Sequence, residues 1–285
     1  VLMKTKHLRL MQRAYVILFF CFMYLPIAYM IVFSFNQSKG YALFTGFTLK
    51  WYTSLLHNSA ILSALRVSLE AALISAVIAT VLGTAASLGI ASMSRKSRLV
   101  VTNITYIPVV NPEIITGISL MLLFVAYQRF AEGVSWLPDT IMGMPTLLIA
   151  HIAFNVPYVI FNVSPKLRQL DPAVYDAALD LGCNPRQAFF KVVLPQLTPA
   201  ILSAFLISLT YSIDDFIISY FTSGTMQTLP IAIYSMTKKK VSPEINALSA
   251  IMFVVILTII LAANAVDSAK ERRLRRAARA EEGRR

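Results

Sequence analysis

Six long apolar segments alternate with shorter polar stretches along the chain. Each is long enough to cross a bilayer as an α-helix, which needs about 20 consecutive, mostly apolar residues. The pattern therefore predicts an all-α, polytopic membrane protein with six transmembrane helices. The expected spans are Ala14–Phe33, Val67–Ala91, Val100–Tyr127, Pro145–Val163, Thr198–Phe221 and Glu244–Val266.

Lys and Arg are concentrated on one side of these spans. They cluster in residues 1–13, after the second span, in the loop after the fourth span, and in the tail 267–285. Because cytoplasmic loops of membrane proteins carry an excess of basic residues, both termini are predicted to be cytoplasmic. The transmembrane domain then covers residues 14–266. The run Lys238-Lys239-Lys240 falls on the outer side and goes against this trend.

Composition agrees with a membrane protein. The 285 residues are 57% hydrophobic and only 14% charged, which is too little charge to cover the surface of a soluble protein of this size. The basic tail suits contact with anionic lipid headgroups. It lacks interleaved aromatic residues, so no nucleic-acid partner is expected. Cys21 lies in the first span and Cys183 in a cytoplasmic loop, so neither a disulfide nor a metal site is expected.

Two spans carry signs of close packing and of a broken helix. In the third span Pro108 and Pro112 remove backbone donors, so a kink or break is expected there. Irregular backbone at membrane depth is tolerated only against protein or a water-filled cavity, so this span is predicted to border a pathway. In the second span small residues recur every fourth position and form a thin ridge that another helix can approach closely. They are Ala71, Ser75, Ala79, Gly83, Ser87 and Ala91.

Four ionisable residues lie inside the predicted spans at similar depth, namely Glu113, His151, Asp214 and Asp215. Such residues are rare within a bilayer and usually mark a substrate or ion route. Two interpretations stay open: the acids line a route for a cation, or they are protonated or bound to backbone donors at a helix break. For His151 a hydrogen-bonded packing role is favoured over contact with a substrate.

The fifth span carries a polar stripe that ends in a carboxylate. Ser208, Tyr211, Ser212 and Asp215 follow i, i+3, i+4, i+7 spacing and so share one face of a continuous helix. This makes Asp215 the acid expected to matter most. Asp214 and Asp215 point about 100° apart on a helix, so only one is expected to face the lumen squarely.

The outer ends of the spans hold two further features. Trp51 is expected to anchor the first outer loop at the membrane interface, or to contact a docking partner or a cationic substrate. Arg66 and Glu70 form an i, i+4 pair with an expected structural role. The predicted substrate pathway comprises Trp51, Glu113, Tyr211, Ser212, Asp214 and Asp215.

Residues 171–195 carry the most specific pattern in the chain. Asp176-Ala177-Ala178 is followed, after three intervening residues, by Gly182 and, after nine more, by Val192-Val193-Leu194-Pro195. This spacing resembles the cytoplasmic EAA loop of ABC importer permeases, with Asp176 in place of Glu and Val192 in place of Ile. The residue types suit such a loop, because Gly182 permits a turn between two short helices and Pro185 fits the first turn of the second. The resemblance implies coupling to an ATPase through Asp176, Ala177, Ala178, Gly182, Leu194 and Pro195.

Further segments resemble the spermidine/putrescine (PotC-type) subgroup of these permeases. They are Leu25–Asn36 leading to Trp51-Tyr52, Asn111–Gly117, Ser212–Phe216, Leu229-Pro230 and Val241–Leu248. The resemblance implies a type I ABC importer permease of the bacterial inner membrane that forms half of a translocation pathway. It implies as partners a second homologous permease subunit, two ATPase subunits that bind ATP and Mg, and an extracytoplasmic polyamine-binding protein.

The chain lacks the motifs of an enzyme. It has no phosphate-binding P-loop, because no two of its ten glycines lie five residues apart. It also has no His-Glu-x-x-His, Cys-x-x-Cys or Gly-x-Ser-x-Gly sequence. We therefore expect a transport subunit that binds no cofactor itself. The alternatives are an importer subunit for an opine, thiamine or an iron chelate, and a secondary transporter, which would need no ATPase-coupling loop.

Overall fold

The computed structural model describes residues 2–39, 43–131, 142–239, 243–258 and 261. Within these ranges the named elements are helices, and one isolated bridge pairs the extended backbone of Asn36 with that of Phe47. The prediction of an all-α chain is confirmed. The tail 267–285, Lys240 and nearly all of the sixth predicted span beyond Thr258 lie outside the described residues.

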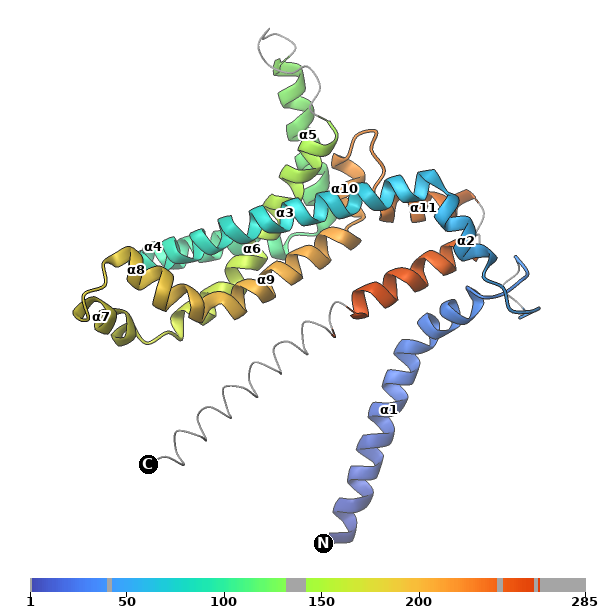
Figure 1. The fold of residues 1–285 in the computed structure, drawn as a ribbon, viewed down its shortest axis with the longest axis horizontal. Coiled ribbons are helices and arrows are strands. Elements are labelled where there is room, and N and C mark those ends of the chain that lie inside the picture. The colour runs from blue at the N-terminus through green and yellow to red at the C-terminus, as the bar shows by residue number, and fades with distance from the viewer. Residues whose placement is uncertain (1, 40–42, 132–141, 240–242, 259–260, 262–285) are drawn as a thin grey trace. The chain divides into compact units, whose positions relative to one another are not determined.

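The helices follow one another along the chain (Figure 1). They are α1 (Leu2–Phe33), α2 (Lys50–His57), α3 (Ser59–Ser92), α4 (Arg95–Val110), α5 (Glu113–Ala131), α6 (Met144–Arg168), α7 (Pro172–Asp180), α8 (Pro185–Ala188), a π-helical turn η1 (Phe189–Val193), α9 (Leu194–Asp214), α10 (Ile217–Thr222) and α11 (Leu229–Lys239). A further apolar helix, Pro243–Thr258, follows α11.

Five of the described helices are long and apolar enough to cross a membrane, and they overlap the first five predicted spans. They are Met11–Phe33, Ser59–Ser92, Glu113–Ala131, Met144–Arg168 and Pro185–Asp214. The described part of the sixth predicted span forms the shorter helix Pro243–Thr258. A total of six spans, and cytoplasmic positions for both termini, stay predictions.

Two predicted spans are divided by a break. The third separates at Asn111 and Pro112 into α4 and α5, as its prolines predicted, whereas Pro108 lies inside α4. The fifth also separates, because α9 ends at Asp214 and the backbone of Asp215 is extended, with φ −64° and ψ 117°. The expectation of one continuous helix through Asp215 is therefore wrong. The reason lies in the Asp215 side chain, which accepts hydrogen bonds from the next helix, as described below.

The chain divides into two compact units, one of residues 60–234 and one of residues 1–59 and 235–285. The first unit is built around α6, which packs against α9, while α5 packs against α10. Four small or branched side chains form one of its buried clusters: Ala79, Val159, Val163 and Ala204. This unit holds every predicted pathway residue except Trp51.

The small-residue ridge of α3 is confirmed as a packing surface. Ala71, Ser75, Ala79, Gly83 and Ser87 are all buried. Of the predicted ridge, Ala91 alone is only partly buried. Close approach along this ridge brings α3 to both α6 and α9, because Gly83 abuts Val159 and Ser75 bonds to Ser212.

Candidate functional site

Asp215 lies at the break between α9 and α10 with its carboxylate turned inward. Oδ2 accepts a hydrogen bond from the backbone N–H of Ser219 at 2.7 Å, and Oδ1 accepts one from Ile218 at 3.2 Å. The residue is only 9% exposed. A carboxylate in this position satisfies N–H groups that the first turn of a helix leaves without partners. Asp215 therefore caps α10, and the interpretation of an acid bound to backbone donors fits this residue.

His151 of α6 contacts the same carboxylate from the other side. Its Nε2 lies 3.4 Å from Asp215 Oδ2 and 3.0 Å from Ser219 Oγ. Its Nδ1 lies 2.8 Å from Ser212 Oγ. The side chain is 2% exposed, so both ring nitrogens find their partners inside the protein. The hydrogen-bonded packing role favoured for His151 is confirmed.

Ser212 joins three helices at this point. Besides His151, its Oγ lies 2.9 Å from Ser75 Oγ of α3 and accepts a hydrogen bond from Asn155 Nδ2 of α6 at 3.1 Å. Buried polar groups of this kind gain their stability from mutual hydrogen bonds. We call Ser75, His151, Asn155, Ser212, Asp215 and Ser219 the polar network.

The polar stripe predicted for the fifth span does not point in one direction. Ser208 and Ser212 are buried, whereas Tyr211 is 41% exposed. Asp215 follows the end of the helix, so helical spacing no longer relates it to the other three. Of the four residues, Ser212 and Asp215 belong to the polar network, Ser208 is buried but is not a member of it, and Tyr211 lies on the outer surface.

Glu113 and Asp214 are the exposed acids beside the two breaks. Glu113 is the first residue of α5 and Asp214 the last of α9, and both side chains are exposed. Helix α5 packs so closely on α10 that a Cβ on Gly117 would lie 2.9 Å from the ring of Phe221. Glu113 lies one helical turn before Gly117, and Asp214 and Asp215 lie shortly before Ile217, whose carbonyl oxygen is 3.5 Å from the same Cβ position. The acids predicted at similar depth therefore gather in one region.

Aromatic side chains border the acids. The rings of Tyr158 and Tyr211 meet edge to face with centroids 4.8 Å apart, and Phe154 lies 6.3 Å from Tyr211. Tyr158 lies on α6, which also contacts α5, the helix that Glu113 begins. Sequence reasoning identified Tyr211 but missed Tyr158. The spacing from His151 through Phe154 to Tyr158 is i, i+3, i+7 on α6, which is the signal that would have found it.

An open groove of about 390 Å³ runs along the end of α4. Its lining residues are Asn103, Tyr106, Ile107, Val110, Asn111 and Pro112. The ring of Tyr106 also stacks on Phe161 of α6, with centroids 4.2 Å apart. One of its lining residues, Pro112, directly precedes Glu113 in the sequence.

The loop 171–195 has the two-helix form predicted for it. Asp171 caps α7 by accepting a bond from Ala173 N at 2.9 Å, and Asn184 caps α8 by accepting one from Gln187 N at 2.8 Å. Gly182 turns the chain between them with φ +87°, and Pro185 begins α8. Of the predicted coupling residues, Asp176, Ala177 and Pro195 are exposed, Leu194 is partly exposed, and Ala178 is buried. No ion pair of Asp176 occurs within the described part of the chain.

Trp51 belongs to the other compact unit, and its contacts are described within that unit. Its ring is 4% exposed, and its indole N–H donates to the carbonyl of Asn36 at 2.7 Å. Lys50 Nζ lies 5.6 Å from the ring centroid. The indole therefore ties α2 to the preceding turn, and a role for it in the substrate pathway stays a prediction. The Arg66–Glu70 pair is confirmed, with Nε 2.7 Å from Oε1.

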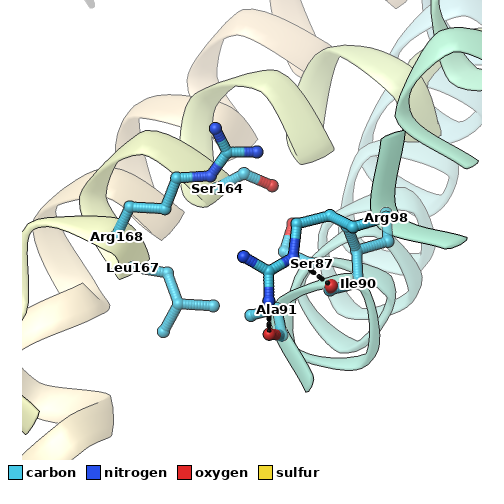
Figure 2. Close-up of a pocket in the computed structure, with 7 residues that line it drawn as sticks. All are labelled: Ser87, Ile90, Ala91, Arg98, Ser164, Leu167 and Arg168. Atoms are coloured by element: carbon cyan, nitrogen blue, oxygen red, sulfur yellow. Dashed lines mark hydrogen bonds between the residues drawn. The ribbon is translucent and has the colours of Figure 1, made fainter. Parts of the chain in front are cut away.

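A small cavity lies between the C-terminal ends of α3 and α6 and the start of α4 (Figure 2). Its volume of about 20 Å³ is roughly the space of one water molecule. Arg98 enters it and donates to the carbonyls of Ile90 at 3.2 Å, Ala91 at 2.5 Å and Met93 at 3.0 Å. This guanidinium therefore satisfies the carbonyls at the end of α3, which is a capping role rather than a ligand site.

The chain is similar in sequence to a known family and to several characterised transport proteins. Residues 79–276 match the family "Binding-protein-dependent transport system inner membrane component". The chain is 39% identical over 236 residues to the putrescine transport system permease protein PotI of Escherichia coli (strain K12), covering 82% of each chain. It is 33% identical over 259 residues to the spermidine/putrescine transport system permease protein PotC of the same organism, covering 90% of this chain and 94% of PotC.

A solved structure shares the fold. A chain of the bacterial ABC transporter that imports the acidic polysaccharide alginate superimposes with a TM-score of 0.72 at 18% sequence identity, covering 93% of this chain and 96% of that one. The type I importer permease fold implied by the resemblance to this family is thereby confirmed. Taken with the family match over most of the chain, the chain belongs to the inner membrane components of binding-protein-dependent transport systems, and it is a permease subunit of an ABC importer.

Proposed function

We propose that this permease imports polyamines, and that Glu113 and Asp214 lie on the route of the substrate. The observation that carries the proposal is the gathering of these exposed acids and the rings of Tyr158 and Tyr211 beside two helix breaks. The names of two relatives, a putrescine permease and a spermidine/putrescine permease, support the same substrate class.

The chemistry of the region suits a flexible organic polycation. Each amine of a polyamine carries about one positive charge at neutral pH, and that charge loses hydration when it enters a partly dry pathway. Carboxylates replace the lost hydration, and the faces of aromatic rings attract ammonium groups. A few spaced acids also let the cation leave again, which a single tight cage would prevent.

The proposed assembly contains further subunits. A second homologous permease completes the pathway, two ATPase subunits bind ATP and Mg, and an extracytoplasmic binding protein delivers the polyamine. The exposed residue Asp176 in the loop 171–195 is proposed to contact the ATPase. The large exposed apolar side chains of α1 suit contact with lipid or with the second permease.

Uptake of labelled putrescine and spermidine tests the proposal in cells that lack other polyamine importers but express the complete transporter. Glu113→Gln and Asp214→Asn should each reduce uptake by about tenfold or more, since each removes a charged partner of the substrate amine. Uptake is normalised to membrane-inserted protein. Glu70→Gln is the matched control, because this acid is also exposed but lies in a surface pair with Arg66 that contributes little.

Several outcomes would contradict the proposal. Unchanged uptake in both acid variants would remove Glu113 and Asp214 from the route. Wild-type cells that accumulate an opine, thiamine or an iron chelate instead of polyamines would reassign the substrate. Uptake that persists without ATP and follows an ion gradient would identify a secondary transporter.

A further inference from the structure

The contacts of His151 bridge the break between α9 and α10. Its Nδ1 faces Ser212 at 2.8 Å, which lies on α9 before the break. Its Nε2 faces Ser219 at 3.0 Å and Asp215 at 3.4 Å, on α10 and within the break. One rigid ring on α6 therefore holds both sides of an interruption that has no continuous backbone hydrogen bonds of its own.

The break decides which of two adjacent acids faces outward. Asp215 is 9% exposed and holds its carboxylate against the start of α10, whereas Asp214 is exposed. If Asp215 lost its inner partners, the extended backbone at this residue would be free to reclose into a helix or to rotate. Reclosure would extend α9 and release Asp215 from α10, and rotation would move α10 together with α5, which packs on it. Either change would alter the surroundings of Asp214 at the end of α9.

We propose that His151 is a positioning residue of the substrate route: by holding Asp215 inward across the break, it makes Asp214 the acid of this pair that meets the substrate. The route itself rests on the function proposed above. His151 touches no substrate in this scheme. It contributes by holding α9 and α10 in a fixed relative geometry across the break. An apolar side chain of similar volume could not do this, because it makes no hydrogen bonds.

Two amide variants separate the contacts of the two ring nitrogens. The amide nitrogen of Asn occupies a place near that of Nδ1, and the amide nitrogen of Gln reaches the place of Nε2. His151→Asn should keep the contact with Ser212 and lose the contacts with Asp215 and Ser219. His151→Gln should keep a donor to Asp215. Both variants have the same chemistry and similar size, so a general loss of packing affects them alike.

The first measurement is the KM and maximal rate of polyamine uptake by the complete transporter. His151→Asn should lower uptake by at least about tenfold, the effect of losing the hydrogen bond to Ser219 and the contact with the Asp215 carboxylate together, while His151→Gln stays within a few-fold of wild type. Combining His151→Asn with Asp215→Asn should be no worse than the more harmful single change, because the two residues act through one another. Ser87→Ala, which deletes a buried hydroxyl bonded only to the backbone of α3 in the described contacts, should leave uptake unchanged.

The second measurement needs no substrate. In a chain with Cys21→Ser and Cys183→Ser, an Asp214→Cys thiol is titrated with a water-soluble, positively charged methanethiosulfonate. His151→Asn should slow its modification by about tenfold, whereas His151→Gln should leave the rate near that of the parent.

The outcomes distinguish this inference from the proposed function. Equal uptake and equal thiol modification in the Asn and Gln variants would overturn the positioning role. A wild-type transporter that ignores polyamines would overturn the proposed substrate, and the thiol rates would still decide for or against His151. Loss of protein in both variants would mark His151 as structural only, and would also count against the proposal.

Discussion

The missing side chain of Gly83 lets α3 approach Val159 of α6. A Cβ placed on Gly83 would lie 2.5 Å from the Cβ of Val159 and 3.1 Å from the carbonyl oxygen of Val156. The first distance is shorter than any ordinary contact, and both Val159 and the carbonyl belong to a buried helix. Close packing of small residues takes the place of the hydrophobic effect between helices in a bilayer.

Gly83→Ala should therefore destabilise the protein by about 1–3 kcal/mol through overpacking. Gly89→Ala on the same helix is the matched control, because a Cβ there meets nothing within 4 Å. That change should be neutral or stabilise by up to about 1 kcal/mol through helix propensity. Thermal denaturation in detergent measures both. Equal midpoints for the two variants would show that the ridge does not pack as described.

Arg98 should also contribute to the stability of the protein, because it caps the C-terminal end of α3 (Figure 2). Arg98→Ala leaves three carbonyls without this donor and should cost about 1–3 kcal/mol. Arg95→Ala removes an exposed charge from the same turn and should change stability by less than about 0.5 kcal/mol. Denaturation midpoints compare the two variants, and similar losses for both would remove the capping role of Arg98.

Much of this architecture could be predicted from the sequence because apolar length, small-residue spacing and turn residues act locally. Gly182 and Pro185 specify the turn and second helix of the loop 171–195 whatever surrounds them. Pro112 likewise specifies the break before α5. Proline fixes its own φ and glycine permits a positive φ, so both act on the backbone locally.

The direction of Asp215 could not be predicted in the same way. The segment Ser212–Phe216 contains neither Pro nor Gly, and its helical spacing suggested an unbroken stripe. The break depends on contacts with His151, which lies 64 positions earlier on α6, and on N–H groups that exist only once α10 has formed. Asp is a favoured capping residue, and its place four residues before Ser219 was the available clue.

Trp51 supports a separate prediction. A role as an anchor of the first outer loop would affect protein stability, whereas contact with the substrate would affect the KM for polyamine. Trp51→Phe keeps most of the buried ring but removes the indole donor to the carbonyl of Asn36. Stability should fall by about 0.5–1.5 kcal/mol, the net contribution of one hydrogen bond. The matched change Lys50→Gln removes the nearby cation and should have little effect. A raised KM for polyamine at unchanged protein stability would instead place the indole on the substrate route.

The loop 171–195 should transmit motion from the ATPase, and its turn gives a direct test. Gly182 has φ +87°, and its N–H donates to the carbonyl of Leu179 at 2.9 Å. Gly182→Pro fixes φ near −65° and removes that donor, so α7 and α8 should lose their relative geometry. Gly182→Asn is the matched control, because Asn adopts positive φ at moderate cost. The Pro variant should insert normally but lose ATPase co-purification, uptake or both. The Asn variant should retain both, as should the exposed change Gln196→Ala.

Charge reversal by Asp176→Lys should also weaken the ATPase contact without affecting insertion, since Asp176 is exposed and forms no ion pair in the described residues. Wild-type co-purification and uptake in both Gly182→Pro and Asp176→Lys would separate this loop from coupling.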